Sequence, residues 1–356
     1  MKYLSETTKK LGFGMMRLPM EGEEVDIPRT SAMVDAFMAA GFHYFDTATP
    51  YLDGRSEMAI RTCLVERYPR ESYILTNKLS AGCFEKEADI RPFFERQLKA
   101  CGVDHFDFYL MHALSAARME KYTVTRAFEI AQELKREGKI RHVGFSFHDS
   151  AQVLDRILTE HPELEVVQLQ LNYLDWEDPK VQSRECYEVC VKHGKPVIVM
   201  EPVRGGRLAD VPKEAREMMT NGSPASYAIR FAAGLEQVVM VLSGMSDMAQ
   251  MEDNLAVMAD FRPLDEGEMA AVERAAEQIR ALQRIPCTDC RYCVEGCPAG
   301  IDIPGVFRIY NARDRQAYAD LAVKSDACLN CGACEAACPQ HLDIRALLKK
   351  VNGRLT

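Results

Sequence analysis

Over the first 260 residues, short apolar runs alternate with longer stretches in which apolar residues recur at helical spacing. The runs are almost continuously hydrophobic, as in Val197-Ile198-Val199-Met200, which is typical of strands covered on both faces in a parallel sheet. The pattern predicts eight strands, at residues 11–14, 43–48, 73–79, 106–112, 140–147, 166–173, 196–202 and 237–244.

The amphipathic stretches between these runs predict a helix after nearly every strand, and several of the helices stop at a glycine. We place them at residues 31–40, 57–66, 90–101, 124–136, 151–159, 180–192, 225–233 and 248–259. Eight strand–helix units over about 250 residues favour a closed (β/α)₈ (TIM) barrel over an open doubly wound sheet. The fold class is therefore α/β, and the active site is expected where the carboxyl ends of the strands converge.

Composition narrows the function classes. The chain has 356 residues, 47% of them hydrophobic, so it can bury a large core plus that of a smaller domain. Its net charge is −9 and it has no basic tract, which argues against a nucleic-acid partner. No run of eighteen apolar residues occurs, and Met1 to Glu6 contain no apolar signal core. We expect a cytoplasmic protein that does not associate with membranes.

Three successive predicted strands end in an ionisable residue, namely Asp46, Lys78 and His112, and Tyr51 follows Asp46 by five residues. Each one alone is explained as well by a salt bridge or an ordinary strand end. Together they should meet at one end of the barrel. There Lys78 can stabilise the phenolate of Tyr51, Asp46 can orient Lys78, and His112 can donate to an oxygen that becomes negative.

The segments Phe45-Asp46-Thr47-Ala48 with Tyr51, Thr76-Asn77-Lys78 and Tyr109-Leu110-Met111-His112 resemble the catalytic signature of the aldo/keto reductase superfamily. The resemblance extends over about residues 1–260. It implies a barrel that binds a nicotinamide dinucleotide, usually the 2′-phosphorylated form, without a Rossmann domain. It also implies hydride transfer to a carbonyl carbon, with Tyr51 protonating the oxygen and the other three residues assisting.

The same resemblance suggests which residues contact the cofactor. Two departures concern the nicotinamide: Phe147 replaces the usual asparagine after Ser146, and Met200 replaces a tyrosine that many members stack on the ring. Residues 243–246 contain no Lys or Arg for a 2′-phosphate, so NADH and NADPH both stay open. The implied cofactor contacts are Gly14, Met15, Ser146, Gln168, Ser243, Gly244 and Asn254.

Eight of the thirteen cysteines lie in the last 70 residues, in two copies of the pattern C-x₂-C-x₂-C-x₃-C-P. This run is the signature of bacterial two-cluster ferredoxins, in which the fourth cysteine of each run ligates the other cluster. Zinc sites and disulfides are the alternatives, but neither accounts for the repeated x₃-C-P ending. We assign one [4Fe-4S] cluster to Cys287, Cys290, Cys293 and Cys338, and the other to Cys328, Cys331, Cys334 and Cys297.

The predicted organisation is a barrel at residues 1–262, a connecting helix within 263–284, and a dicluster domain at 285–356. The two cysteine runs are 41 residues apart, which leaves room for helices at 303–311 and 315–323 and indicates a mainly α-helical ferredoxin. The remaining cysteines are scattered and are expected to be structural thiols: Cys63, Cys83, Cys101, Cys186 and Cys190.

The combined prediction is an oxidoreductase that reduces a small carbonyl compound, or oxidises an alcohol, with NAD(P)H and with two clusters for electron transfer. Nicotinamide passes a hydride whereas a [4Fe-4S] cluster passes single electrons, and no flavin motif is evident. Two alternatives therefore stay open. In one, the clusters are structural or redox-sensing and the barrel alone is catalytic; in the other, the protein is a non-catalytic electron-transfer or binding protein. A redox partner protein is a further candidate.

Overall fold

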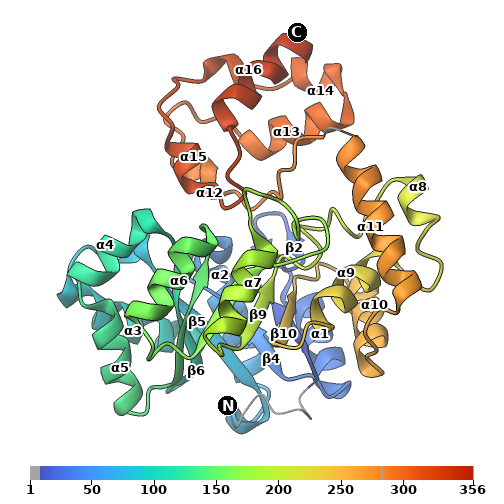
Figure 1. Ribbon diagram of the computed structural model, residues 1–356. Coiled ribbons are helices and arrows are strands. Elements are labelled where there is room, and N and C mark those ends of the chain that lie inside the picture. Colours follow the sequence, from blue (N-terminus) through green and yellow to red (C-terminus); the bar gives the residue numbers. More distant parts are fainter. Residues whose placement is uncertain (1–8, 283, 356) are drawn as a thin grey trace.

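The computed structural model describes residues 9–282 and 284–355 (Figure 1). Its main part is a closed barrel of parallel strands in the order β1-β10-β9-β8-β7-β6-β5-β4, closed by pairing of β1 with β4. The predicted fold class is confirmed. The strands are β1 Leu11–Gly14, β4 Tyr44–Asp46, β5 Ile74–Ser80, β6 Phe106–Leu114, β7 Ile140–Phe147, β8 Val166–Gln170, β9 Val197–Met200 and β10 Val238–Ser243.

Helices surround the barrel, and several begin at a side chain that caps a backbone amide. The Ser150 hydroxyl accepts from the Val153 amide at the start of α6, and Asp247 caps α10 in the same way. No helix in the described part of the chain is both long and apolar enough to cross a bilayer. These helices are α1 Ile27–Ala39, α2 Arg55–Ile60, α3 Glu87–Cys101, α4 Ala116–Val124, α5 Ala127–Arg136, α6 Ala151–Glu160, α7 Ser183–Lys192, α8 Lys213–Arg216, α9 Pro224–Ala233, α10 Met248–Ala259 and α11 Glu266–Ala281.

Some predicted boundaries were wrong for local reasons. The helix expected at 124–136 begins at Ala127, because Arg126 before it has a left-handed φ of 55°, and the separate helix α4 was not predicted. The helix expected at 180–192 begins at Ser183, since the Asp178 carboxylate accepts from the amides of residues 180 and 181 and holds a turn there. A hairpin of β2 Met20–Glu21 and β3 Glu24–Val25 was not predicted.

The barrel interior is layered. Inward-facing apolar side chains form a core of their own, separate from the larger core between strands and helices: Tyr44, Phe108, Leu110, Val166, Ile198, Met240 and Leu242. The next inward positions, two residues further along several of these strands, are polar. Because successive side chains of a strand alternate between faces, this parity places Asp46, His112 and Gln168 directly above the apolar layer.

The C-terminal residues form a small helical module with its own core, which includes Ile303, Phe307, Leu348 and Val351. The helix predicted at 315–323 is shorter, since the chain leaves it to pack residues 321 and 323 on this core. The last helix was not predicted. The helices are α12 Tyr292–Glu295, α13 Ile303–Ala312, α14 Arg315–Ala319, α15 Ala333–Ala337 and α16 Ile344–Leu355.

The module lies over the carboxyl end of the barrel, and α11 runs beside the barrel and leads up to it (Figure 1). Hydrogen bonds fix this position at several points around the mouth. They join Arg17 Nη2 to Thr288 O (2.7 Å), Arg207 Nη1 to Ile285 O (2.6 Å) and the side-chain amides of Gln170 and Gln340 to each other (2.9 Å).

The two parts pack closely at Gly205. A Cβ atom there would lie 2.4 Å from Thr288 O, whereas one on Gly206, which also has a positive φ, would meet nothing within 4 Å. We expect Gly205→Ala to loosen the module and Gly206→Ala to add only backbone strain of about 1–2 kcal/mol. Trypsin cleavage after the exposed Arg284 should be faster in Gly205→Ala than in Gly206→Ala. Equal rates would contradict tight docking at this point.

Candidate active site and cluster ligands

Three of the predicted catalytic residues are hydrogen-bonded to one another at the carboxyl end of the barrel. Lys78 Nζ lies 2.5 Å from Asp46 Oδ1 and 3.2 Å from the Tyr51 hydroxyl, and it also donates to Thr47 O at 2.8 Å. Gln168 Nε2 donates to the second oxygen of Asp46 at 3.1 Å. Lys78 is fully buried, so its orientation is fixed by these partners.

The fold explains how these residues meet. Asp46 ends β4 and Lys78 lies near the end of β5, which pairs in parallel with β4. Tyr51 comes from the loop after β4, where its amide donates to Ala48 O at 2.9 Å and a 3₁₀ turn begins. Leu52 and Asp53 in that turn have left-handed φ values of 52° and 54°. The turn brings the phenol back over the mouth of the barrel.

Burial is the largest influence on the pKa values of Tyr51 and Lys78. It raises the pKa of Tyr51 well above its usual value, and the carboxylates of Asp46 and Glu201 raise it further. Burial also lowers the pKa of Lys78, although Asp46 opposes this effect. We expected Lys78 to make Tyr51 more acidic; Lys78 has the required position, but the net shift has the opposite sign. Tyr51 therefore holds its proton at neutral pH, as a proton donor must.

His112 lies beside this group as a neutral imidazole. Burial, with the Lys78 charge, holds the pKa of His112 well below its usual range. Its Nδ1 is 2.6 Å from Ser80 Oγ, and with Ser80 donating, Nε2 carries the proton. The ring meets Tyr51 edge-on, with centroids 6.1 Å apart, and Tyr292 of the module at 6.4 Å.

Two cavities meet at His112 under the module. An inner cavity of about 110 Å³ reaches Asp46, Tyr51 and Gln168, and its roof contains Cys290 and Gln340 of the module. An outer cavity of about 420 Å³ continues over the ends of β5 and β6 and reaches Cys338. The two share His112, His148, Tyr292 and Pro339. Residues of both parts of the chain thus enclose the site.

The structure divides the implied cofactor contacts into two groups. Gly14, Gln168 and Gly244 line the inner cavity. The other four are not among its lining residues. Met15 is buried and its carbonyl accepts from Ser56; the Ser146 hydroxyl accepts from the Ala113 amide; Ser243 is buried; and the Asn254 amide donates to Gln250 O on α10.

Sequence reasoning missed three side chains of the inner cavity, Arg17, Glu201 and Tyr292. Glu201 follows β9 with a left-handed φ of 57°, and its Oε2 is buried without a hydrogen-bond partner. Tyr292 occupies a variable position between two ligand cysteines, Cys290 and Cys293. Tyr292 reaches the site only through the docking of the module. Glu201 directly follows β9, so the rule that ionisable residues at strand ends gather at the barrel mouth could have found it.

The cysteines of the first predicted cluster lie close together. The pKa of Cys293 is raised to about 12, mainly by burial and to a smaller extent by the charges of Cys290, Cys287 and Cys338. Such an effect requires nearby thiols, and it includes Cys338 from the second run. In residues 9–282 and 284–355, no three His, Cys, Asp or Glu side chains converge as around one metal ion. The four thiols fit a larger soft-metal cluster, which prefers sulfur ligands.

The relative positions of the four cysteines of the second predicted cluster are less completely defined. Burial raises the pKa of Cys334, with smaller effects from Glu335 and Cys328, so Cys334 and Cys328 are neighbours. Cys331 is exposed and Cys297 is partly buried. Their assignment to the second cluster stays a prediction.

Paired substitutions test the exchange of the fourth ligand between the runs. With exchange, Cys287→Ser combined with Cys338→Ser damages one cluster, and the protein should keep about four of about eight irons. Cys287→Ser combined with Cys297→Ser damages both and should leave few. Iron and sulfide analysis of anaerobic preparations gives the answer. If the Cys287→Ser and Cys297→Ser double variant instead kept about four irons, while the Cys287→Ser and Cys338→Ser double variant kept few, each run would hold its own cluster.

Comparison with known proteins identifies the class to which this fold and site belong. The model of the aldo/keto reductase family matches residues 10–277, and that of the 4Fe-4S dicluster domain matches residues 286–342. The chain belongs to the aldo/keto reductase family, whose members are oxidoreductases, and carries a 4Fe-4S dicluster domain after the barrel. The family and the fused module predicted from the sequence are confirmed.

Relatives resemble the barrel at modest identity. An aldo-keto reductase of Mycobacterium sp. (strain KMS) is 27% identical over 266 residues, or 74% of this chain and 87% of the relative. The NADH-specific methylglyoxal reductase of Escherichia coli (strain K12) is 26% identical over 186 residues, which cover 47% of this chain and 54% of that protein. The chain thus spans about half the length of this second relative.

Solved structures show the same fold. Aldo-keto reductase AKR11C1 from Bacillus halodurans, in its holo form, has a TM-score of 0.63 at 24% identity, covering 75% of this chain and 91% of that one. An aldo-keto reductase from Klebsiella pneumoniae in complex with NADPH has a TM-score of 0.61 at 21% identity, covering 75% and 90%.

Proposed function

We propose that the protein is an NAD(P)H-dependent oxidoreductase that reduces a small carbonyl compound at Asp46, Tyr51, Lys78 and His112, with two [4Fe-4S] clusters for electron transfer. One observation carries the proposal. Tyr51 and His112 share a cavity with Cys290, a predicted cluster ligand. The proton-transfer group and the cluster site are therefore parts of one enclosed site.

The chain's own residues divide the proton chemistry. The Tyr51 phenol donates its proton to the carbonyl oxygen, and the Lys78 ammonium, 3.2 Å away, stabilises the phenolate that forms. Asp46 holds Lys78 in place through its 2.5 Å contact. The Nε2–H of neutral His112 donates to the same oxygen as it gains charge. The nicotinamide, when bound, supplies the hydride.

The inner cavity provides contacts for a nicotinamide but not yet room for a dinucleotide. Gln168 offers an amide, Gly14 and Gly244 offer approachable backbone, and Met200 offers an apolar side chain. The volume of about 110 Å³ is below the range of about 300–1,000 Å³ typical of ligand pockets. We therefore propose that the module moves away from the barrel mouth when the dinucleotide enters. The absence of a partner for Glu201 Oε2 also favours a ligand donor there.

We propose that the carbonyl substrate enters through the outer cavity. Its volume of about 420 Å³ suits a small molecule, and its wall includes His112. The name of the Escherichia coli relative suggests methylglyoxal as a first substrate to assay. Both NADH and NADPH are proposed cofactors.

Cys287, Cys290, Cys293 and Cys338 would hold one cluster and Cys328, Cys331, Cys334 and Cys297 the other, and the clusters would supply one-electron transfer. A redox partner protein then exchanges electrons with the module. We also propose that the protein works in the cytoplasm, where reducing conditions keep the ligand thiols from pairing as disulfides.

The test starts from protein purified anaerobically and assayed with methylglyoxal and either nucleotide. We expect reduction of the carbonyl and about eight irons per chain. Fewer than about six irons would contradict two clusters. Binding of neither nucleotide would contradict the reductase assignment. Full activity after cluster removal, in a protein that stays folded, would instead support a structural role for the clusters.

A further inference from the structure

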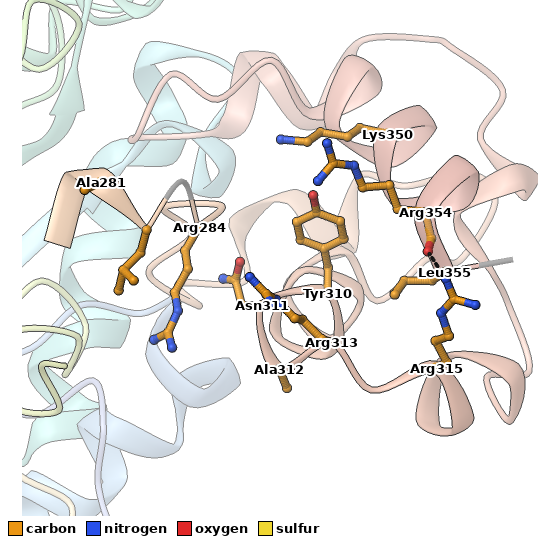
Figure 2. Close-up of a pocket in the computed structure, with 11 residues that line it drawn as sticks. Ala281, Arg284, Tyr310, Asn311, Ala312, Arg313, Arg315, Lys350, Arg354 and Leu355 are labelled. Carbon is orange, nitrogen blue, oxygen red and sulfur yellow. Dashed lines mark hydrogen bonds between the residues drawn. The ribbon is translucent and has the colours of Figure 1, made fainter. Parts of the chain in front are cut away.

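Five cationic side chains line a cavity of about 690 Å³ at the junction of the C-terminal module with the connection that follows α11. The cavity lies between the end of α11, helix α13 and helix α16 (Figure 2). Its lining contains no acidic side chain. The cations around it are Arg284, Arg313, Arg315, Lys350 and Arg354.

These cations differ from most arginines of the chain, which form ion pairs with acidic side chains, as Arg230 does with Glu268 at 2.6 Å. No ion pair with a described residue is found for any of the five. Asp314 lies between Arg313 and Arg315 in sequence, yet its carboxylate caps α14 by accepting from the Ala317 amide at 2.9 Å. It is therefore turned away from the cavity. In a chain of net charge −9, such a grouping is not a consequence of composition.

Helix dipoles explain only part of the grouping. Arg354 lies in the last turn of α16 and Arg313 follows α13, where a cation is favourable. Arg315 is the first residue of α14, the end at which the dipole disfavours a cation. The left-handed φ of 58° at Arg313 is that of a helix C-cap, whose amide donates to Ile309 O and Tyr310 O. Arg315 Nη2 donates to Arg354 O at 3.3 Å, which joins α14 to the end of α16 beside the cavity.

The lining also has surface for an organic group. Tyr310 faces the cavity with the Lys350 ammonium 5.7 Å from its ring centroid, and Leu282 and Leu355 add apolar walls. Figure 2 shows Lys350, Arg354 and Arg313 reaching toward the space in front of Tyr310. Guanidinium groups bind phosphate in a two-pronged fashion, and an aromatic ring can stack on a base. The volume is in the range of nucleotide-sized ligands.

We propose that this cavity binds a nucleoside di- or triphosphate, with the phosphates on the arginines and the base beside Tyr310. Arg284 belongs to the connection after α11, whereas the other four cations belong to the module. The ligand therefore ties the connection to the module. This site is separate from the barrel mouth and does not depend on the proposed reductase activity.

Calorimetric titration of the anaerobic holoprotein with ADP, and separately with tripolyphosphate, tests the proposal. We expect ADP to bind, and Arg313→Gln combined with Arg354→Gln to weaken it by at least about 100-fold, since each charged hydrogen bond contributes about tenfold or more. Lys349→Gln, on the same helix but outside the cavity, is the matched control and should change affinity less than about twofold.

Unchanged iron content and far-ultraviolet circular dichroism establish that the variants fold. Absence of ADP binding at millimolar concentration would overturn the proposal, as would equal binding by the double variant. Binding of tripolyphosphate without ADP would overturn the nucleotide assignment. Binding of polyglutamate without binding of ADP would also overturn the proposal and would indicate an acidic protein partner.

Discussion

Tyr51→Phe should reduce the rate of carbonyl reduction by about 10²- to 10⁴-fold, the usual contribution of a positioned general acid. The substitution keeps the ring, its edge contact with His112 and its position 4.8 Å from Lys78 Nζ, and it removes only the hydroxyl. Iron content and the thermal unfolding midpoint should stay unchanged. The measurement is the steady-state rate with methylglyoxal and saturating nucleotide.

Tyr292 offers a matched control, because it presents a second, partly buried phenol to the same cavity from the module. Tyr292→Phe should lower the rate by less than about tenfold, since its ring stays in contact with His112 and no cation lies within hydrogen-bonding distance of its hydroxyl among the described contacts. A larger loss in Tyr292→Phe than in Tyr51→Phe would assign the proton donor to the module instead of the barrel.

Lys78→Met should affect both activity and stability. It leaves the Asp46 carboxylate buried without its cation, and removal of one partner of a buried pair costs about 3–5 kcal/mol. Both side chains are almost fully buried, at 0% and 4% exposure. We expect a lower free energy of unfolding, followed in urea through the fluorescence of Trp176, the single tryptophan, and loss of carbonyl reduction.

The double variant Asp46→Leu with Lys78→Met separates the two effects. It removes both charges, so most of the lost stability should return while activity stays absent. Activity near that of the original protein in the double variant would show that the pair has only a structural role. A double variant as unstable as Lys78→Met would show that packing, and not the unpaired carboxylate, causes the loss.

The barrel was predictable because its signals are local. The near-continuous apolar runs give the strands, and the alternation of side chains along a strand places Asp46 one layer above the inward-facing Tyr44. The cysteine pattern is equally local, so the dicluster module followed from spacing alone. Helix boundaries failed where a single backbone angle decides the structure, as at Arg126.

The part of the site that the C-terminal module contributes was not predictable, for a different reason. Tyr292 reaches the inner cavity only because the module docks on the barrel, and that docking depends on tertiary contacts such as Arg17 with Thr288. Resemblance suggests that Ser146 contacts the cofactor, and this stays a prediction; the structure adds that its hydroxyl accepts from the Ala113 amide at 2.7 Å. A family pattern gives the position of a residue in the chain but not its neighbours.

The central claim is that the Tyr51 site and the clusters form one redox unit. Anaerobic titration with NADPH, and then with NADH, tests it when followed through the visible absorbance of the clusters. We predict that a nucleotide which supports methylglyoxal reduction also bleaches the clusters, and that methylglyoxal restores their absorbance. Clusters that stay oxidised under NADPH and NADH, yet are bleached by dithionite, while carbonyl reduction proceeds normally, would contradict the claim.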